Sequence, residues 1–184
     1  MSEVRDFTVP TELIEPARRV IEANRAAGLT IAMAESCTGG LVSAALTEIP
    51  GSSDVFEAGF VTYSNGAKTD MLGVSEEIVE TFGAVSIAVA WGMAQGVLAK
   101  SKADVAVAIT GVAGPGGGSL RKPVGLVVFA RARRGADPSE VTADTREFGD
   151  LGRGGIRLQA ALCALELLMP PGTVDEDSAC AIGP

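Results

Sequence analysis

The sequence contains no histidine among its 184 residues. A chain without histidine cannot build a Ser-His-Asp triad, a Cys-His pair or a histidine-ligated zinc site from its own side chains. Any side chain that moves a proton in this protein must therefore be of another type, and lysine, tyrosine and the carboxylates are the candidates.

Cysteine is also scarce, and the sequence has only Cys37, Cys163 and Cys180. Their odd number and their spacing match neither a disulfide framework nor a metal-ligand motif. We therefore expect no metal site and a reducing compartment, with the cytoplasm as the default location.

The sequence also lacks a surplus of positive charge and lacks long apolar runs. The formal net charge is -8, whereas sequence-independent binding of nucleic acid needs a surplus of Lys and Arg, so we expect no nucleic-acid partner. A local pocket for one phosphate stays compatible with this charge. No apolar run reaches the roughly 20 residues that span a bilayer, and residues 1–10 lack the apolar core of a secretory signal, so we expect no membrane partner.

The composition is nevertheless strongly apolar, with 47% hydrophobic residues. This content predicts one domain over residues 1–170, followed by a flexible tail over residues 171–184, where Pro, Gly, Asp and Glu follow a helical stretch. Abundant apolar helix surface also favours a homo-oligomer.

Apolar periodicity and turn residues divide the chain into alternating helices and strands. Thr11 is expected to cap the first helix and Gly28 to end it. We predict helices over residues 11–27, 39–47, 67–72, from 75, 86–98 and 156–168, and strands over 29–34, 56–63, 103–109, 124–132 and 141–148.

This order of elements predicts an α/β fold, a three-layer α/β/α sandwich with a mixed sheet. The early alternation of strands and helices favours parallel strands at the centre, and the late hairpin favours antiparallel edge strands. Ligands of such sheets bind at the carboxyl ends of strands. The loops after residues 34, 63 and 109 are consequently the candidate site.

The first of these strand ends carries the motif AESCTGG at residues 34–40. Ser36 lies before a helix, whose free amides near Cys37 and Thr38 can stabilise the oxyanion of an acyl transfer. The alternative is an ordinary helix cap with glycines for close packing. Cys37 is a rival nucleophile, but without a histidine neighbour we interpret it as a buried bystander.

The second strand end carries the phenol of Tyr63 and the amine of Lys68. A strand-helix-strand arrangement would bring both toward Ser36, and burial would lower the pKa of the lysine so that it can act as a base. Taken alone, Lys68 fits a solvated helix residue equally well, and Tyr63 fits a core aromatic with a satisfied hydroxyl.

The third strand end leads into a glycine-rich loop over residues 111–118. Thr110, Gly111 and Gly114 belong to a segment whose backbone amides can face phosphate or carboxylate, although a loop without a ligand is the alternative. The loop lacks the Walker and dinucleotide patterns, so ATP and NAD are not expected as cofactors.

Two further segments rank below these three. The turn at residues 51–53 offers a hydroxyl on Ser53, although a helix-exit turn explains it equally well. Arg153 and Arg157 begin the last predicted helix and could bind a phosphate, although exposed arginines on a helix are common.

Taken together, the motifs resemble the CinA C-terminal-domain family in order and spacing over about residues 11–169. The matching segments are residues 34–40, 51–53, 59–65 with Lys68, 83–86 and 110–115. The resemblance implies a stand-alone amidohydrolase that converts nicotinamide mononucleotide to nicotinic acid mononucleotide and ammonia in pyridine-nucleotide salvage. It implies a small-molecule nucleotide substrate, no cofactor and no metal.

The resemblance also implies residue roles: Ser36 as nucleophile, Lys68 as its proton acceptor, Tyr63 nearby and Ser53 as an assisting hydroxyl. The expected substrate-binding positions are Cys37, Thr38, Gly39, Gly40, Thr110, Gly111, Gly114 and Arg153.

One stretch departs from the family pattern. Where relatives often have Gly-Asp-Arg, residues 149–153 read GDLGR, so the role of Arg153 stays open. Two alternative functions also stay open: a non-catalytic mononucleotide sensor linked to competence or DNA damage, and an amidase for another small amide.

Overall fold

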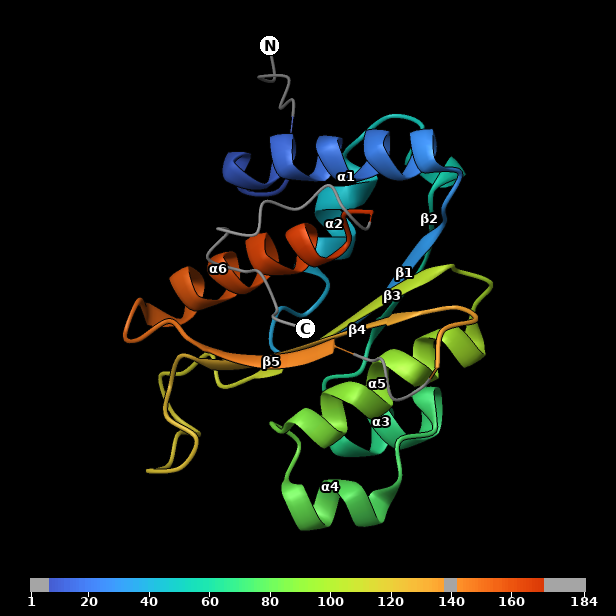
Figure 1. Ribbon diagram of the computed structural model, residues 1–184. Helices are drawn as coiled ribbons and strands as arrows, with labels where there is room; N and C mark the ends of the chain where they lie inside the picture. The colour runs from blue at the N-terminus through green and yellow to red at the C-terminus, as the bar shows by residue number, and fades with distance from the viewer. Residues whose placement is uncertain (1–6, 138–141, 171–184) are drawn as a thin grey trace.

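The structure is a computed structural model that describes residues 7–137 and 142–170. The predicted tail over residues 171–184 lies outside the described residues. A five-stranded sheet is covered on both faces by helices, which gives three layers (Figure 1).

The sheet is mixed. Its strands are β1 (Ile31–Glu35), β2 (Phe56–Val61), β3 (Val105–Gly111), β4 (Leu126–Arg133) and β5 (Thr142–Glu147), arranged in the order β2-β1-β3-β4-β5. β1 runs parallel to β2 and β3, whereas β4 is antiparallel to β3 and β5. The predicted mixed α/β sandwich is confirmed, with one detail added: the antiparallel strands lie on one side only, and the edge strand β2 is parallel.

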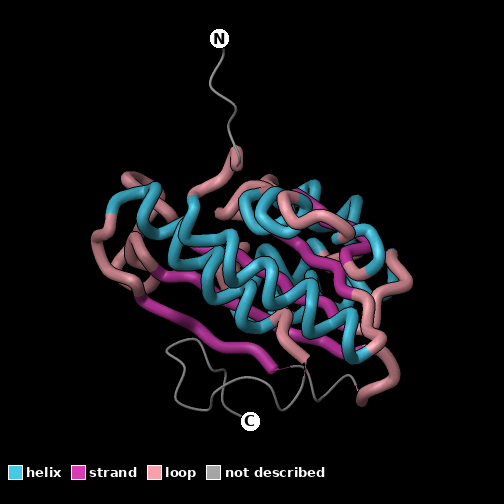
Figure 2. Tube along the Cα trace, turned by 90° about the horizontal axis from the view of Figure 1, so that it is seen from above, coloured by secondary structure: helices cyan, strands magenta, loops and turns pink. Residues whose placement is uncertain are grey.

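The two faces of the sheet carry side chains of different size. Helices α1 (Ile14–Ala27), α2 (Leu41–Thr47) and α6 (Gly152–Leu167) lie on one side of the sheet, and α3 (Asn65–Leu72), α4 (Glu76–Phe82) and α5 (Ile87–Lys100) lie on the other (Figures 1 and 2). On this second side α5 packs on the strands, and α3 and α4 pack against α5. Because successive side chains of a strand point to opposite faces, β1 and β3 give bulky residues to the first face and alanines to the second. The bulky residues include Ile31, Met33 and Val107, and the alanines are Ala32, Ala34, Ala106 and Ala108.

The helix termini agree only partly with the sequence predictions. Gly28 ends α1 in the left-handed conformation with φ of 68°, as predicted. The predicted cap by Thr11 is wrong, because Thr11 begins a 3₁₀ turn whose N-cap residue is Pro10 and which has no side-chain cap. Helix α3 begins at Asn65 because the hydroxyl of Ser64 accepts a hydrogen bond from the amide of Ala67 at 3.0 Å.

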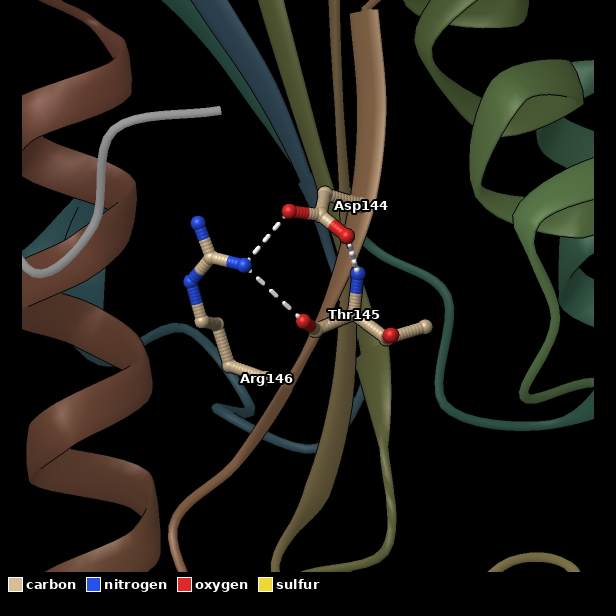
Figure 3. A network of polar contacts seen from close by, with 3 residues as sticks. All are labelled: Asp144, Thr145 and Arg146. Atoms are coloured by element: carbon tan, nitrogen blue, oxygen red, sulfur yellow. Dashed lines mark hydrogen bonds and ion pairs between the residues drawn. The ribbon is translucent and has the colours of Figure 1, made fainter. Parts of the chain in front are cut away.

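The edge strand β5 is polar. Figure 3 shows the guanidinium of Arg146 bonded to the carboxylate of Asp144 and to the carbonyl of Thr145 on the same strand. Charged side chains along an edge strand oppose pairing with the edge of another sheet.

None of the helices in the described ranges is long and apolar enough to cross a membrane. Cys37 is a free thiol, whereas Cys163 in α6 is disulfide-bonded. The expectation that the cysteines build no disulfide framework did not anticipate this bond at Cys163. Spacing along the chain does not decide this, because a disulfide requires only that the fold bring two Cβ atoms to within about 4 Å.

Candidate active site

A cleft of about 290 Å³ opens at the carboxyl ends of β1 and β3. Its walls come from the turn after β1, residue 63 and the first turn of α3, residues 84–85, the glycine-rich loop after β3, and Arg153 of α6. The cleft lies at the edge of the sheet where the sequence predicts the site.

Ser36 lies at the base of this cleft and is 8% exposed. Its amide donates to the carbonyl of Ile109 at 3.0 Å, and its carbonyl accepts from the amide of Gly39 at 3.1 Å. The first bond ties the end of β1 to β3, and the second closes the turn, so the backbone of Ser36 is held on both sides.

Lys68 reaches Ser36 from α3. Its Nζ donates to Ser36 Oγ at 3.1 Å, to the carbonyl of Thr62 at 2.9 Å and to the carbonyl of Ser64 at 3.5 Å. The side chain is only 1% exposed, which rejects the alternative of a solvated helix residue. The two side chains that the sequence analysis paired are therefore in hydrogen-bond contact.

The surroundings of Lys68 favour the neutral amine. All three of its acceptors are neutral oxygens, and no acidic side chain in the described part of the chain forms a salt bridge with it. Desolvation lowers the pKa of Lys68 below its ordinary value, and the nearby thiol of Cys37 opposes this in part. A neutral amine beside a hydroxyl can accept its proton.

Cys37 lines the same cleft but is a poor nucleophile. Burial, assisted by the charge of Glu35, raises the pKa of its thiol to about 12. Because the thiolate is the reactive form of cysteine, a thiol with this pKa is inert near neutrality. The structure thus favours the interpretation of Cys37 as a bystander.

Tyr63 and Arg153 meet at the mouth of the cleft. Tyr63 is 61% exposed, which rejects the alternative of a core aromatic. Arg153 donates from Nη2 to the Tyr63 hydroxyl at 2.9 Å and from Nη1 to the carbonyl of Gly114 at 2.7 Å. No aspartate or glutamate lines the cleft, so the guanidinium is a cation that an anionic ligand can reach.

The glycine-rich loop forms a further wall of the cleft. Gly114 has φ of 74°, and a Cβ there would lie 2.6 Å from a methyl of Val124, so the loop requires glycine at this position. The amides of Ala113 and Gly114 have no hydrogen-bond partner among the described residues. The hydroxyl of Thr110 donates to the carbonyl of Ala84 at 2.9 Å and so joins the loop to the segment before α5.

The structure does not bring four of the expected site residues into the cleft. Ser53 is exposed in the 3₁₀ turn that precedes β2, at the amino end of the strand, whereas Ser36 follows the carboxyl end of its parallel neighbour. Thr38, Gly39 and Gly40 are absent from the lining. Thr38 is buried and accepts at its carbonyl from Arg157, and the amide of Gly40 is bound to Glu35.

Sequence reasoning missed Glu35. This residue is fully buried, and its carboxylate accepts hydrogen bonds from the amides of Gly40, Val42 and Ser43 and from the hydroxyl of Ser43. Two signals were present: an acidic residue ends an otherwise apolar strand, and position 40 lacks a side chain that could cap the helix.

No group of three His, Cys, Asp or Glu side chains in residues 7–137 and 142–170 is arranged to hold a metal ion. The cleft instead offers a serine, a buried lysine and an arginine. This donor set suits acyl transfer on a substrate that carries an anionic group.

The fold and site define an α/β/α sandwich protein with a buried serine-lysine pair in a cationic cleft. Residues 14–170 match the CinA C-terminal domain, and the chain belongs to this family.

Several curated proteins are similar over most of the chain. Nicotinamide-nucleotide amidohydrolase PncC of Enterobacter agglomerans is 52% identical over 144 residues, which cover 78% of this chain and 85% of that protein. PncC of Escherichia coli K12 is 48% identical over 158 residues, which cover 86% and 93%. A putative competence-damage inducible protein of Symbiobacterium thermophilum is 51% identical over 147 residues, and this chain spans only 34% of its length.

Solved structures share the fold. The crystal structure of competence/damage inducible protein CihA from Agrobacterium tumefaciens matches with a TM-score of 0.83 and 52% sequence identity, and the match covers 88% of this chain and 96% of that one. A CinA superfamily protein from Klebsiella pneumoniae matches with a TM-score of 0.79 and 35% identity, covering 85% and 94%.

Proposed function

We propose that this protein is an amidohydrolase that deamidates nicotinamide mononucleotide to nicotinic acid mononucleotide and ammonia in pyridine-nucleotide salvage. The observation that carries the proposal is the 3.1 Å contact between Ser36 Oγ and the buried Nζ of Lys68 inside the cleft. The names of the two PncC relatives support the reaction and the substrate. We also propose that the enzyme acts in the cytoplasm, and this proposal rests on the pyridine-nucleotide substrate and not on the cysteines, because Cys163 is disulfide-bonded.

In the proposed reaction, Ser36 Oγ attacks the carboxamide carbon while neutral Lys68 accepts the serine proton. The tetrahedral intermediate then collapses, and Lys68 returns the proton to the departing nitrogen, which leaves as ammonia. Water attacks the resulting acyl ester, again with Lys68 as base, and the acid product leaves as Ser36 is protonated. The positive charge of the pyridinium ring makes the carbonyl carbon more electrophilic, so a lysine suffices as base.

The oxyanion needs donors that are not already bound. The amides of Gly39 and Gly40 are occupied by Ser36 and Glu35, so the start of α2 does not offer them. Two amides without a partner among the described residues, those of Ala113 and Gly114, belong to the glycine-rich loop that lines the cleft, and the amide of Cys37 lies in the turn itself. We assign oxyanion stabilisation to these amides.

Substrate recognition is assigned to the mouth of the cleft. Arg153 is the cation nearest the solvent there, and its present partners are a neutral phenol and a neutral carbonyl. A phosphate would form stronger, charge-assisted hydrogen bonds with the same guanidinium. A nucleotide is therefore a better ligand for this cleft than free nicotinamide.

The proposal is tested by ammonia release from nicotinamide mononucleotide. Ser36→Ala should lower kcat by about 10³-fold or more, because the serine forms the covalent bond. The melting temperature should stay close to that of the unmodified protein, since the substitution removes one hydroxyl at the cleft surface. Intact mass spectrometry of trapped enzyme should place the acyl group on Ser36.

Three results would contradict the proposal. Near-native turnover by the Ser36→Ala enzyme would end the serine mechanism, and an acyl group on Cys37 would replace it with a thiol mechanism. Tight binding of the nucleotide without ammonia release would indicate a sensor instead of an enzyme.

A further inference from the structure

We propose that Glu35 is a positioning residue, whose buried carboxylate holds the turn at residues 36–40 so that Ser36 Oγ faces Lys68. The inference rests on the proposed function, because it concerns the geometry of the same serine. Glu35 itself does not line the cleft and makes no contact with the reacting atoms.

The first observation is the number of donors around the carboxylate. Oε2 accepts from the amides of Gly40 at 3.0 Å and Val42 at 3.2 Å, and Oε1 accepts from the amide of Ser43 at 2.8 Å and its hydroxyl at 2.7 Å. A fully buried carboxylate is tolerated only when its oxygens are hydrogen-bonded, and here four donors meet this condition. The carboxylate therefore has one well-defined position.

The second observation is that the beginning of α2 lacks an ordinary cap. The N-cap residue is Gly40, with φ of 92° and no side chain to accept a hydrogen bond from the helix. A serine, threonine or aspartate at an N-cap normally satisfies these amides locally. Here the carboxylate of Glu35, the residue just before the nucleophile, accepts hydrogen bonds from these amides instead. These bonds join the two ends of the segment from Glu35 to Ser43, and Ser36 lies within this segment.

The third observation is that the Glu35 carboxylate makes no bond to Lys68, and that Thr62, which holds Lys68, is tied to Glu35 only through the backbone, at 2.9 Å from its amide to the Glu35 carbonyl. Its Nζ is bonded to the carbonyls of Thr62 and Ser64, and its backbone belongs to α3. A change confined to the Glu35 side chain would therefore act first on the turn that carries Ser36 and would leave the backbone bonds that hold Lys68 unaltered. Arg153 makes its own hydrogen bonds to Tyr63 and Gly114, which lie outside the turn.

The space around Ser43 fits this assignment. A Cβ at Gly59 of β2 would lie 2.3 Å from the Ser43 hydroxyl oxygen, so the glycine leaves room for the hydroxyl that bonds Glu35. The strand next to the turn thus accommodates the carboxylate network.

The test compares Glu35→Gln with Ile21→Ala, a core substitution in α1 that destabilises the protein by removing apolar contacts but none of the hydrogen bonds of the carboxylate. Glutamine keeps the length of the side chain but turns an NH₂ group toward backbone amides. Displacement of a reacting group by about 1 Å costs about 100-fold in rate. We expect kcat for nicotinamide mononucleotide to fall about 100-fold in Glu35→Gln, with KM within about threefold.

The control decides between positioning and general destabilisation. Ile21→Ala should keep kcat within about threefold at a temperature where both variants are folded. Equal kcat values for the two variants would overturn the inference. So would a Glu35→Gln enzyme whose KM rises while its kcat stays unchanged. If Glu35→Gln does not fold, Glu35→Asp takes its place, because it keeps the charge but draws the turn inward. Near-native kcat in Glu35→Asp would then overturn the inference.

A second readout separates this inference from the proposed function. The rate at which a fluorophosphonate labels Ser36 depends on the serine and lysine but not on a nucleotide substrate. If the unmodified protein releases no ammonia from nicotinamide mononucleotide, the proposed function fails, and labelling still tests Glu35. Slower labelling of Glu35→Gln than of Ile21→Ala supports the inference, and equal labelling overturns it.

Discussion

At the scale of single residues, the site depends on a lysine that is buried without a countercharge. Lys68 has carbonyl oxygens and one serine hydroxyl around Nζ, and desolvation is the main cause of its lowered pKa. A carboxylate partner would have favoured the charged amine and removed its capacity to accept a proton. The absence of histidine is thus compensated by the environment of one amine.

The lowered pKa of Lys68 predicts the pH profile of the reaction. Because the neutral amine is the active form, kcat/KM should rise with pH and level off above the pKa of the folded enzyme, which lies below the ordinary value of lysine. Lys68→Arg should lower kcat/KM by about 10³-fold or more at every pH tested, since arginine stays protonated. A profile that falls as pH rises over this range would contradict the assignment.

Stability gives an independent check on the same pKa. Between the folded and the unfolded pKa of Lys68, the unfolded chain binds more protons than the folded one, so stability increases with pH in this window. The difference in unfolding free energy between the unmodified protein and Lys68→Met should therefore rise with pH, by up to about 1.4 kcal/mol for each unit of pKa difference. Denaturant titrations at several pH values measure it, and a flat difference would show that the pKa is unshifted.

Arg153 should determine affinity for the phosphate. Removing a charged hydrogen-bond donor costs about 1.5 to 3 kcal/mol, so Arg153→Gln should raise KM for nicotinamide mononucleotide about 10- to 100-fold. Activity on free nicotinamide should change little, because that substrate has no phosphate. Arg121→Gln is the matched control, since Arg121 is exposed and does not line the cleft. An equal loss on both substrates would show that Arg153 acts elsewhere.

The sequence predicted the reacting pair, Ser36 and Lys68, but not Glu35, whose carboxylate holds the turn around Ser36. Ser36 and Lys68 follow strands that the periodicity predicts, and parallel strands end at the same edge of a sheet, so their meeting could be foreseen. Ser53 precedes its strand, which by the same topology places it at the other edge. Glu35 could not be assigned, because its partners are backbone amides whose positions appear only once α2 is formed.

At the scale of elements, the position of Lys68 depends on how α3 packs against α5. A Cβ on Gly96 of α5 would lie 2.2 Å from the carbonyl oxygen of Leu72, the last residue of α3. Gly96→Ala should therefore displace α3, destabilise the protein by about 1 to 3 kcal/mol and lower kcat. Thermal unfolding and ammonia release measure the two effects.

Gly92 provides the matched control on the same helix. A Cβ there would meet only the two methyls of Val74, at 3.6 and 3.7 Å, which are ordinary contacts. Gly92→Ala should stabilise the protein by about 0.5 to 1 kcal/mol, because alanine is the better helix former. The prediction fails if the two alanine variants have similar stability.

The elements themselves were largely predictable, and their ends were not. The period-two and helical patterns located the described strands and helices because burial on the sheet faces imposes them. Helix α6 begins at Gly152, four residues before the predicted residue 156, although residues 152–155 read GRGG and favour a loop. Tertiary contacts outweigh this weak propensity, since Arg153 is anchored to Gly114 and Tyr63.

At the scale of the whole molecule, net charge limits the partners. The charge of -8 opposes the phosphate contacts that non-specific DNA binding requires, where dissociation constants are typically about 10⁻⁴ to 10⁻⁶ M. At about 10 μM protein and about 0.15 M salt, fluorescence anisotropy of a labelled DNA duplex should not change. A saturable increase in anisotropy would show that the protein binds DNA directly and would contradict this prediction.

The reacting pair and the cationic arginine of the cleft come from two separate stretches of the chain. Ser36 and Lys68 both lie within residues 31–72, whereas the glycine-rich loop and Arg153 lie within residues 110–153. The nucleophile and its base are consequently encoded apart from the loop and Arg153, so selection can alter the residues at the mouth of the cleft without replacing the nucleophile. A library randomised at residues 116–122 would explore new carboxamides on an unchanged nucleophile, which makes this small sandwich a modular starting point for engineering amidases.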